Sequence, residues 1–305
     1  MWYFICYFAV FLGKSNDLNE VEMKLIHTIK DLQQMLEEAR AGGMKIGLVP
    51  TMGALHAGHA SLVKQSVAEN EMTVVSVFLN PTQFNDKKDL EKYPRTLDAD
   101  CALLEKEGAD IVFAPSVEEM YPEPDTRQFS YPPVDTVMEG AFRPGHFNGV
   151  CQIVSKLFAA VNPDRAYFGE KDFQQIAVIR AMVKDLGFNI EIVPCPVIRE
   201  ESGLAMSSRN TLLSDDERKV AASISQVLFR SKNFATNHTL EETKRFVVDA
   251  LNAVVGLEVQ YFDIVDGISL QSLETWEDSD FIVGCITVFC GRQPIRLIDH
   301  IKYKG

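Results

Sequence analysis

Two histidines three positions apart are the first residues whose types and spacing suggest chemistry. His56 and His59 flank Ala57-Gly58, where an apolar, strand-like segment gives way to helical periodicity. Side chains three apart share one face of a helix, and a helix N-terminus offers unpaired N–H groups and positive potential. An anionic nucleotide would suit this corner, and Gly58 would leave room for a flat ligand. Two surface histidines, or a zinc pair whose third ligand is not evident nearby, would show the same spacing.

Two later segments carry side chains that bind phosphate groups. Gly169-Glu170-Lys171-Asp172 opens a predicted helix, where charged residues are most often solvated capping groups. Met206-Ser207-Ser208-Arg209 combines small, hydroxylated and cationic side chains, which suit phosphate oxygens that carry transition-state charge. Serine-rich loops are also common on protein surfaces. Taken alone, each of the two segments is therefore explained at least as well by a solvent-exposed structural role.

Alternating apolar and amphipathic segments are predicted to position these residues. A helix is expected from Lys24 to the glycines at 42–43, and irregular chain at 115–133. Repeated strand–helix alternation predicts an α/β protein with a Rossmann-like, doubly wound parallel sheet and ligands at the carboxyl ends of its strands. The predicted strands are 45–50, 73–79, 110–114 and 190–197, with an apolar stretch at 166–168, and the helices among them are 62–70, 96–108, 148–160 and 172–186.

The pattern changes after residue 198, which predicts a domain boundary there. Residues 23–198 would form the Rossmann-like domain, and residues 199–305 a smaller α+β C-terminal domain that closes over the nucleotide site. Residues 1–22 read as an atypical N-terminal extension, and their apolar run of eleven residues is too short to span a bilayer. In the C-terminal domain we expect helices at 215–230 and 240–255 and strands at 257–265, 279–289 and 296–297.

Composition narrows the classes of function. The 305 residues carry a net charge of −13, so the molecule as a whole repels phosphate backbones, and we expect neither a nucleic-acid nor a membrane partner. A tRNA synthetase is disfavoured because it would need a basic RNA-binding module. The six cysteines lack metal-binding or disulfide-framework spacing, which is typical of free thiols in a reducing compartment.

Taken in order along the chain, these segments closely resemble the pantoate–β-alanine ligase (pantothenate synthetase) family of the nucleotidyltransferase superfamily. The resemblance runs from about Met23 to the end of the chain and includes several long motifs in the same order. Those motifs are H-x-G-H at 56–59, Lys171-Asp172, S-S-R at 207–209, and the segments 49–55, 78–84, 93–95, 143–150 and 296–299.

The resemblance implies an ATP-dependent condensation of (R)-pantoate with β-alanine, which gives pantothenate, AMP and pyrophosphate through a pantoyl-adenylate intermediate. It also implies ATP as a substrate, Mg²⁺ as a cofactor, a homodimer and a cytoplasmic location. The alternative is another small-molecule nucleotidyltransferase of cofactor biosynthesis, which would release pyrophosphate without joining an amine. A non-catalytic nucleotide-binding protein is disfavoured because all the phosphate-binding side chains are present together.

Roles for individual residues follow from the same resemblance. His59 would be the proton donor, and Asp100 would lie near the metal, although Mg²⁺ held mainly by ATP is the simpler arrangement. Gln83 and Gln175 would hold pantoate with Asn80 close by, and Gln83 would also reach β-alanine. The catalytic residues would be His56, His59, Lys171 and Arg209. The ATP site would comprise Met52, Gly53, His56, Gly58, His59, Gly169, Glu170, Lys171, Asp172, Ile198, Met206, Ser207, Ser208 and Arg209.

Chemistry supports these residue types independently. A carboxylate is already ionised near neutral pH, so its attack on phosphorus needs positioning and charge neutralisation more than it needs a base. We therefore expect Lys171, Arg209 and both histidines to act as cations. A glutamine amide donates and accepts hydrogen bonds at once, which suits the hydroxyl groups of pantoate.

Overall fold

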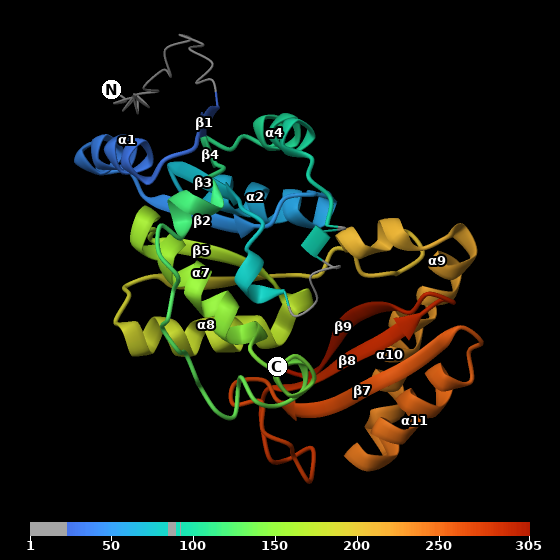
Figure 1. Ribbon diagram of the computed structural model, residues 1–305. Helices are drawn as coiled ribbons and strands as arrows, with labels where there is room; N and C mark the ends of the chain where they lie inside the picture. The colour runs from blue at the N-terminus through green and yellow to red at the C-terminus, as the bar shows by residue number, and fades with distance from the viewer. Residues whose placement is uncertain (1–22, 85–89, 92) are drawn as a thin grey trace, which may run out of the picture.

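Six parallel strands form the larger of two sheets. The computed structural model describes residues 23–84, 90–91 and 93–305, and it orders these strands β1-β4-β3-β2-β5-β6 (Figure 1). Every neighbouring pair is parallel, so the predicted α/β class and parallel sheet are confirmed. The predicted extension at 1–22 lies outside the described residues. The strands are β1 (Lys24–Ile26), β2 (Ile46–Thr51), β3 (Met72–Val77), β4 (Ile111–Phe113), β5 (Arg165–Gly169) and β6 (Glu191–Cys195).

Helices cover both faces of this sheet, as a doubly wound topology requires. On one face α1 (Ile29–Ala41), α7 (His146–Val161) and α8 (Phe173–Leu186) pack over the apolar side chains of the strands. On the other face α2 (Ala57–Glu69) and α4 (Leu97–Lys106) enclose a second apolar cluster. The central strands are apolar on both sides because both sides are buried.

Strands β2 and β5 separate before they end. Their register contains only Gly47 with Arg165 and Leu48 with Ala166, whereas β2 continues to Thr51 and β5 to Gly169. β3 flanks β2 on its other side, so the strand order reverses between β2 and β5. In an open α/β sheet this reversal point leaves a crevice at the carboxyl ends. The segments that leave these two strands carry the H-x-G-H and Lys-Asp motifs.

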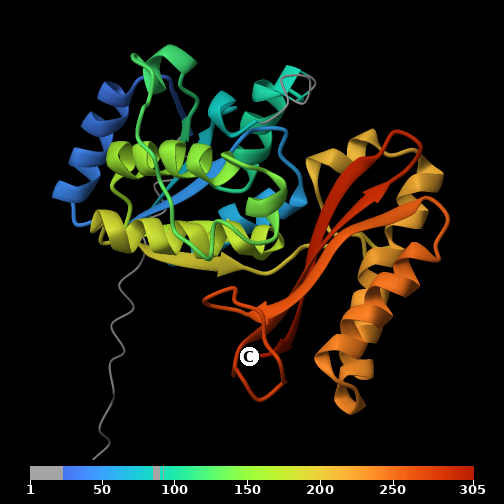
Figure 2. The same ribbon diagram turned by 60° about the horizontal axis from the view of Figure 1, so that its bottom comes forward.

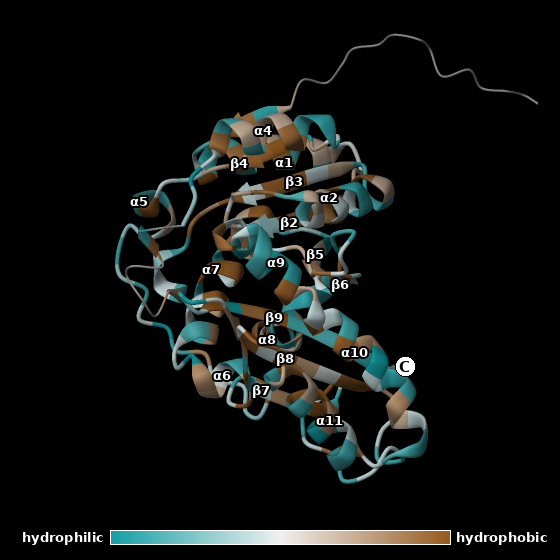
Figure 3. Cartoon of the chain, turned by 90° about the vertical axis from the view of Figure 1, so that its right-hand side faces the viewer, coloured by the Kyte–Doolittle hydropathy of each residue, from teal (hydrophilic) through white to brown (hydrophobic). Residues whose placement is uncertain are grey.

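A smaller antiparallel sheet, β7-β8-β9, follows in the chain and confirms the predicted α+β C-terminal part (Figure 2). Its helices α10 and α11 carry hydrophobic and hydrophilic residues on different sides (Figure 3), and their apolar sides bury a separate core against the sheet. The boundary at residue 198 stays a prediction. The elements are α9 (Asp215–Ala221), α10 (Ser223–Phe234), α11 (Leu240–Asn252), β7 (Leu257–Asp266), β8 (Ile282–Cys290) and β9 (Ile295–Lys304).

Short elements connect the larger ones. The 3-10 turn η2 joins β5 to α8, and η3 begins the chain that enters the C-terminal helices. α5 interrupts the segment 115–133 that was predicted to be irregular, because Ser116 caps its first turn by accepting a hydrogen bond from Glu119 N–H. The short elements are η1 (Pro81–Gln83), α5 (Val117–Met120), α6 (Glu139–Phe142), η2 (Glu170–Asp172), η3 (Ser208–Leu212) and η4 (Ala235–Asn237).

Three predicted elements are wrong in extent. The helix expected from Lys24 begins only at Ile29, because Lys24–Ile26 is an edge strand paired with β4 and Thr28 caps the helix behind it. The helix expected over 215–230 is two helices, with Ala222 between them. The strand expected at 296–297 extends through the whole of β9, because β8 supplies a pairing partner along its length. Cys6 lies outside the described residues, and the other five cysteines are free, as predicted.

A largely buried ion pair joins α6 to the smaller sheet. Glu139 of α6 accepts hydrogen bonds from both terminal nitrogens of Arg296 on β9, and also from Tyr261 and Thr287 at 2.8 Å each. Burial opposes ionisation of this carboxyl, but the hydrogen bonds and charge of Arg296 outweigh it and lower the pKa of Glu139 to about 2. A second contact lies near it, where Lys302 donates to Glu170.

We predict that Glu139→Ala lowers the free energy of unfolding by about 3 kcal/mol, because Arg296, whose side chain is only 21% exposed, loses its carboxylate. Urea unfolding followed by circular dichroism measures the change. Asp216→Ala is the matched control, since it breaks an ion pair with Lys219 that is largely exposed, and its midpoint should stay at the wild-type value. A Glu139→Ala midpoint as high as that of the control would contradict the structural importance of this pair.

Candidate active site

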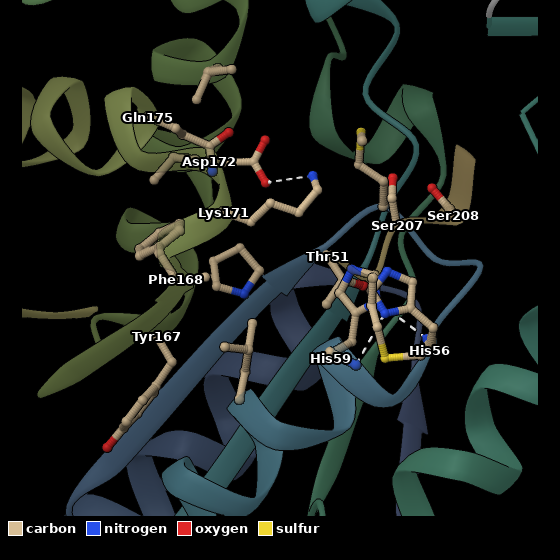
Figure 4. Close-up of a pocket in the computed structure, with 18 of the residues that line it drawn as sticks. Thr51, His56, His59, Tyr167, Phe168, Lys171, Asp172, Gln175, Ser207 and Ser208 are labelled. Atoms are coloured by element: carbon tan, nitrogen blue, oxygen red, sulfur yellow. Dashed lines mark hydrogen bonds and ion pairs between the residues drawn. The ribbon is translucent and has the colours of Figure 1, made fainter. Parts of the chain in front are cut away.

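A cavity of about 220 Å³ opens between the diverging ends of β2 and β5 (Figure 4). The loop at 206–209 encloses it from the side of the C-terminal helices. The structure thus brings together segments that are more than 150 positions apart in the sequence. The predicted site residues that line the cavity are Met52, His56, Gly58, His59, Asn80, Gln83, Gly169, Lys171, Asp172, Gln175, Ile198, Met206, Ser207, Ser208 and Arg209.

The loop that follows β2 is held by a buried carboxylate. Asp100 on α4 accepts hydrogen bonds from Ala54 N–H at 3.0 Å and Leu55 N–H at 2.8 Å, and from the Thr96 hydroxyl. Gly53 and Ala54 both have positive φ, which glycine adopts freely but alanine adopts only when its surroundings fix it. Gly53 therefore shapes the turn beside the cavity and does not line it.

These contacts give Asp100 a structural role, and its predicted metal role stays a prediction. Both of its oxygens accept hydrogen bonds from the protein. Residues 23–84, 90–91 and 93–305 contain no group of three or more His, Cys, Asp or Glu side chains that could hold a metal ion. Asp100 is a positioning residue for the loop in this structure. A zinc ion bound by His56 and His59 would find no third protein ligand among the same residues.

The two histidines cap α2 reciprocally. Gly58 N–H donates to His56 Nδ1 at 3.1 Å, and His56 N–H donates to His59 Nδ1 at 3.3 Å. In a neutral imidazole whose Nδ1 accepts, the proton is on Nε2. Both rings are therefore tautomers that present an Nε2–H donor, with ring centroids 4.1 Å apart.

The expected positive charge on these histidines is wrong for the protein without ligands. Burial, with a further contribution from the charge of Lys171, lowers the pKa of His56 to about 4. Burial, together with the adjacent His56 and Lys171, lowers the pKa of His59 to about 3. At neutral pH both rings are uncharged hydrogen-bond donors, so Lys171 and Arg209 supply the cationic charge.

Gly58 is required for a reason that differs from the predicted one. A Cβ atom at this position would lie 2.8 Å from His56 Cε1 and 2.9 Å from its Nδ1. The absence of a side chain therefore lets the imidazole of His56 fold back over the first turn of α2. That Gly58 also leaves room for a flat ligand stays a prediction.

The segment after β5 sends its charged side chains in two directions. Lys171 extends into the cavity, with Nζ 3.5 Å from Asp172 Oδ2, and points toward Ser207 in Figure 4. Glu170 points away, because Lys302 donates to its carboxylate and His300 lies 4.0 Å from it. Glu170 was predicted to be in the ATP site, but its side chain contacts β9 and does not line the cavity.

The segment at 206–209 is fixed at both ends. Met206 N–H donates to Ile198 O at 2.9 Å, and the hydroxyl of Ser207 caps η3 by accepting from Arg209 N–H at 3.3 Å. Ser208 Oγ lies 3.3 Å from the phenol oxygen of Tyr93, which belongs to the other side of the cavity. Tyr93 is thus a lining residue to which the sequence analysis gave no role, although its motif was noted.

Two of the predicted amides are oriented by their neighbours. Asn80 is buried and donates to Gly149 O and Gln83 Oε1, while its own oxygen accepts from the Tyr121 hydroxyl. Because its hydrogen-bonding groups are used within the protein, Asn80 positions Gln83. Gln83 lines the cavity beside Met52, and Gln175 reaches it from the first turn of α8.

An apolar wall was missed by the sequence analysis. α7 lines the cavity with Val150, Ile153, Val154 and Leu157, and Phe78 adds to it from the end of β3. The signal was present, because the segment from Gly149 to Val161 is apolar on nearly every side and a helix with such a composition must be buried on several faces. The wall gives the cavity an apolar side opposite its polar one.

Comparisons with known proteins agree with this geometry. Residues 24–302 match the family profile described as Pantoate-beta-alanine ligase. A pantothenate synthetase of Bacteroides fragilis (strain YCH46) is 70% identical over 282 residues, which are 92% of this chain and 99% of that protein.

The chain belongs to the pantoate–β-alanine ligase family. Solved structures support this membership. A pantothenate synthetase from Thermus thermophilus has a TM-score of 0.86 at 42% identity, over 93% of this chain and 100% of that one. A pantoate-beta-alanine ligase from Francisella tularensis, complexed with beta-gamma ATP and beta-alanine, has a TM-score of 0.77 at 34% identity, over 92% and 98% of the two chains. The ligation of pantoate with β-alanine predicted from the sequence is therefore confirmed at the level of the family.

We predict that neither His56 nor His59 titrates between pH 8 and pH 5 in the protein without ligands, because burial keeps both rings neutral. The Cε1–H signals in NMR spectra measure this, with His56→Gln and His59→Gln variants for assignment. The control is the protein unfolded in urea, where both signals should titrate near the ordinary value of about 6.5. A midpoint near 6.5 for either ring in the folded protein would refute the assigned charge state.

Proposed function

We propose that this chain first joins pantoate to AMP and then transfers the pantoyl group to β-alanine. The observation that carries the proposal is one cavity that is lined by phosphate-binding donors, two amides and an apolar wall. The donors are the two Nε2–H groups, Lys171 and the segment at 206–209, and the amides are Gln83 and Gln175. ATP would occupy the first group of residues and pantoate the second.

In the first step a carboxylate oxygen of pantoate attacks the α-phosphorus of ATP. The new P–O bond forms as the bond between the α-phosphorus and the bridging oxygen breaks, and pyrophosphate leaves. Lys171 and Arg209 would stabilise the charge that moves onto the leaving group, while neutral His56 and His59 donate hydrogen bonds to the phosphates. Because both rings donate hydrogen bonds in their neutral form, ATP can bind without a change in the protonation of either histidine.

In the second step the neutral amine of β-alanine attacks the acyl carbon of pantoyl adenylate. A C–N bond forms, the C–O bond to the phosphate of AMP breaks, and the amine nitrogen releases one proton to water. Gln83 and Gln175 would hold the hydroxyl groups of the pantoyl moiety during both steps, so the acyl carbon would not need to move between them.

Magnesium would enter with ATP as the MgATP complex. Mg²⁺ is commonly held by substrate phosphates and water with only one or two carboxylates. Among the described residues that line the cavity, Asp172 is the carboxylate, and it lies beside Lys171. The ion would neutralise phosphate charge alongside Lys171 and Arg209.

The remaining predictions concern the whole molecule. Within the described ranges, no helix is long and apolar enough to cross a membrane. The homodimer stays a prediction that sedimentation equilibrium would test. The cytoplasmic location also stays a prediction, which cell fractionation would test.

The experiment that tests the proposed function supplies ATP, pantoate and β-alanine and detects the products by mass spectrometry. We expect pantothenate and AMP in equal amounts, and neither product when pantoate is omitted. A simple nucleotidyltransferase, the alternative weighed above, would release pyrophosphate without forming pantothenate. Formation of ADP in place of AMP would contradict the proposal.

We predict that Lys171→Ala slows adenylate formation by about 10²–10³-fold, because one preorganised cation is lost from the charge that develops on pyrophosphate. The second step releases AMP and involves no pyrophosphate, so pantoyl adenylate supplied directly should react at close to the wild-type rate. Single-turnover kinetics of both steps measure this, with the exposed Lys219→Ala as control. An equal loss in both steps would show that Lys171 binds the adenylate generally.

A further inference from the structure

Lys171 is the cation on which the proposed first step depends, but its own segment does little to fix its side chain. It lies in the three-residue turn η2, and neither Gly169 before η2 nor Asp172 before α8 provides a side-chain cap. Among the described residues, the ammonium of Lys171 pairs with Asp172 at 3.5 Å, which is too long for a strong hydrogen bond. The direction of Lys171 therefore depends on the elements that pack against this turn.

Strand β9 contacts the residues that come just before and just after Lys171. Lys302 donates a hydrogen bond of 2.5 Å to Glu170, the residue before Lys171. The ring of His300 stacks on that of Phe173, two residues after Lys171, with centroids 5.3 Å apart. Lys302 and His300 are two positions apart on one strand, so their side chains share a face of the smaller sheet. A single strand thus holds both neighbours of the catalytic lysine.

The contact of Lys302 with Glu170 is the charged part of this attachment. Glu170 is buried, and a buried carboxylate needs a partner that compensates its charge. His300 does not supply that charge, because its Nε2 lies 4.0 Å from the carboxylate and burial lowers the pKa of its ring, which is therefore neutral at pH 7. Lys302, and not His300, is thus the cation that keeps the side chain of Glu170 on β9.

The geometry of the turn transmits this contact to Lys171. Consecutive side chains in a 3-10 turn point about 120° apart, because the turn has about 3.0 residues. With Glu170 held on β9, Lys171 extends into the cavity and points toward Ser207 (Figure 4). Release of Glu170 would allow the turn to rotate and move the ammonium from this position. Misplacing a catalytic group by about 1 Å can cost about 100-fold in rate.

We propose that Lys302 is a positioning residue that acts through Glu170 to hold Lys171 beside the phosphates of ATP. This inference rests on the proposed function, in which Lys171 stabilises the charge on the pyrophosphate leaving group. Lys302 does not line the cavity, so the smaller sheet contributes to the reaction indirectly through β9. The contribution is confined to the first step, because the second step involves no pyrophosphate.

The test measures both steps by single-turnover kinetics in Lys302→Met, which removes the charge but keeps most of the length of the side chain. We expect adenylate formation to slow by about 10-fold, while pantoyl adenylate supplied directly reacts with β-alanine at the wild-type rate. Lys302→Arg should recover most of the lost rate, because it keeps a cationic donor.

Two further variants keep the test independent of one substitution. Glu170→Gln removes the charge from the other side of the contact and should slow the same step, with the second step unchanged. Lys304→Met is the matched control, because Lys304 lies on the same strand but pairs with the fully exposed Asp280. It should behave as wild type in both steps, and circular dichroism checks that each variant is folded.

Combination with Lys171→Ala separates positioning from a general structural role. Once Lys171 is absent, Lys302 has no catalytic group to position, so the double variant should be no more than about twofold slower than Lys171→Ala alone. A residue that merely stabilises the fold would slow both backgrounds by the same factor.

Three results would overturn the proposal for Lys302. They are adenylate formation at the wild-type rate in Lys302→Met, an equal loss in both steps, and a further loss of about 10-fold in the double variant. The proposed function has a separate readout, because wild-type protein should exchange pyrophosphate with ATP when pantoate is present and β-alanine is absent. No such exchange in the wild-type protein would overturn the proposed function itself.

Discussion

The separation of β2 from β5 after two paired residues is the constraint on which the site depends. Paired strands would continue the hydrogen-bonded ladder to the edge of the sheet and leave no space between their ends. Because they diverge, the backbone beyond Leu48 and Ala166 opens a crevice, and the two chains that leave it carry the H-x-G-H and Lys-Asp motifs. α7 then closes the crevice with an apolar wall, and the loop at 206–209 completes it from the C-terminal side.

Within that crevice the backbone determines the chemistry of the side chains. The histidines at the start of α2 accept hydrogen bonds from amide groups, which fixes their tautomers and directs two N–H donors outward. Asp100 does not line the cavity, but it accepts hydrogen bonds from the loop that precedes the two histidines. Positive charge comes from Lys171 and Arg209, on segments that enter from β5 and from the C-terminal helices. Donors and cations are thus supplied by different elements, and the smaller sheet contacts the larger part of the chain through Arg296 with Glu139 and Lys302 with Glu170.

Most of this arrangement could be predicted from the sequence because each signal was local. Strand–helix alternation gave the sheet, and motifs in a fixed order gave the segments that line the cavity. The errors arose where contacts between residues far apart in the sequence determine the structure. Lys24–Ile26 is a strand because β4 pairs with it. The side chain of Glu170 lies outside the cavity because Lys302 on β9 donates a hydrogen bond to it. Asp100 accepts hydrogen bonds from a loop that is 45 and 46 residues away in the sequence. The neutral charge of the histidines depends on their burial, which a sequence does not display.

The central claim is that one cavity directs the carboxylate of pantoate to the α-phosphorus of ATP. Pantoate labelled with ¹⁸O in both carboxylate oxygens tests this directly when it reacts with ATP and β-alanine. The account predicts that one labelled oxygen is recovered in the phosphate of AMP, because the bond between that oxygen and phosphorus survives when the amine displaces AMP. Label in orthophosphate, with ADP as the other product, would place the attack on the γ-phosphorus and contradict the account.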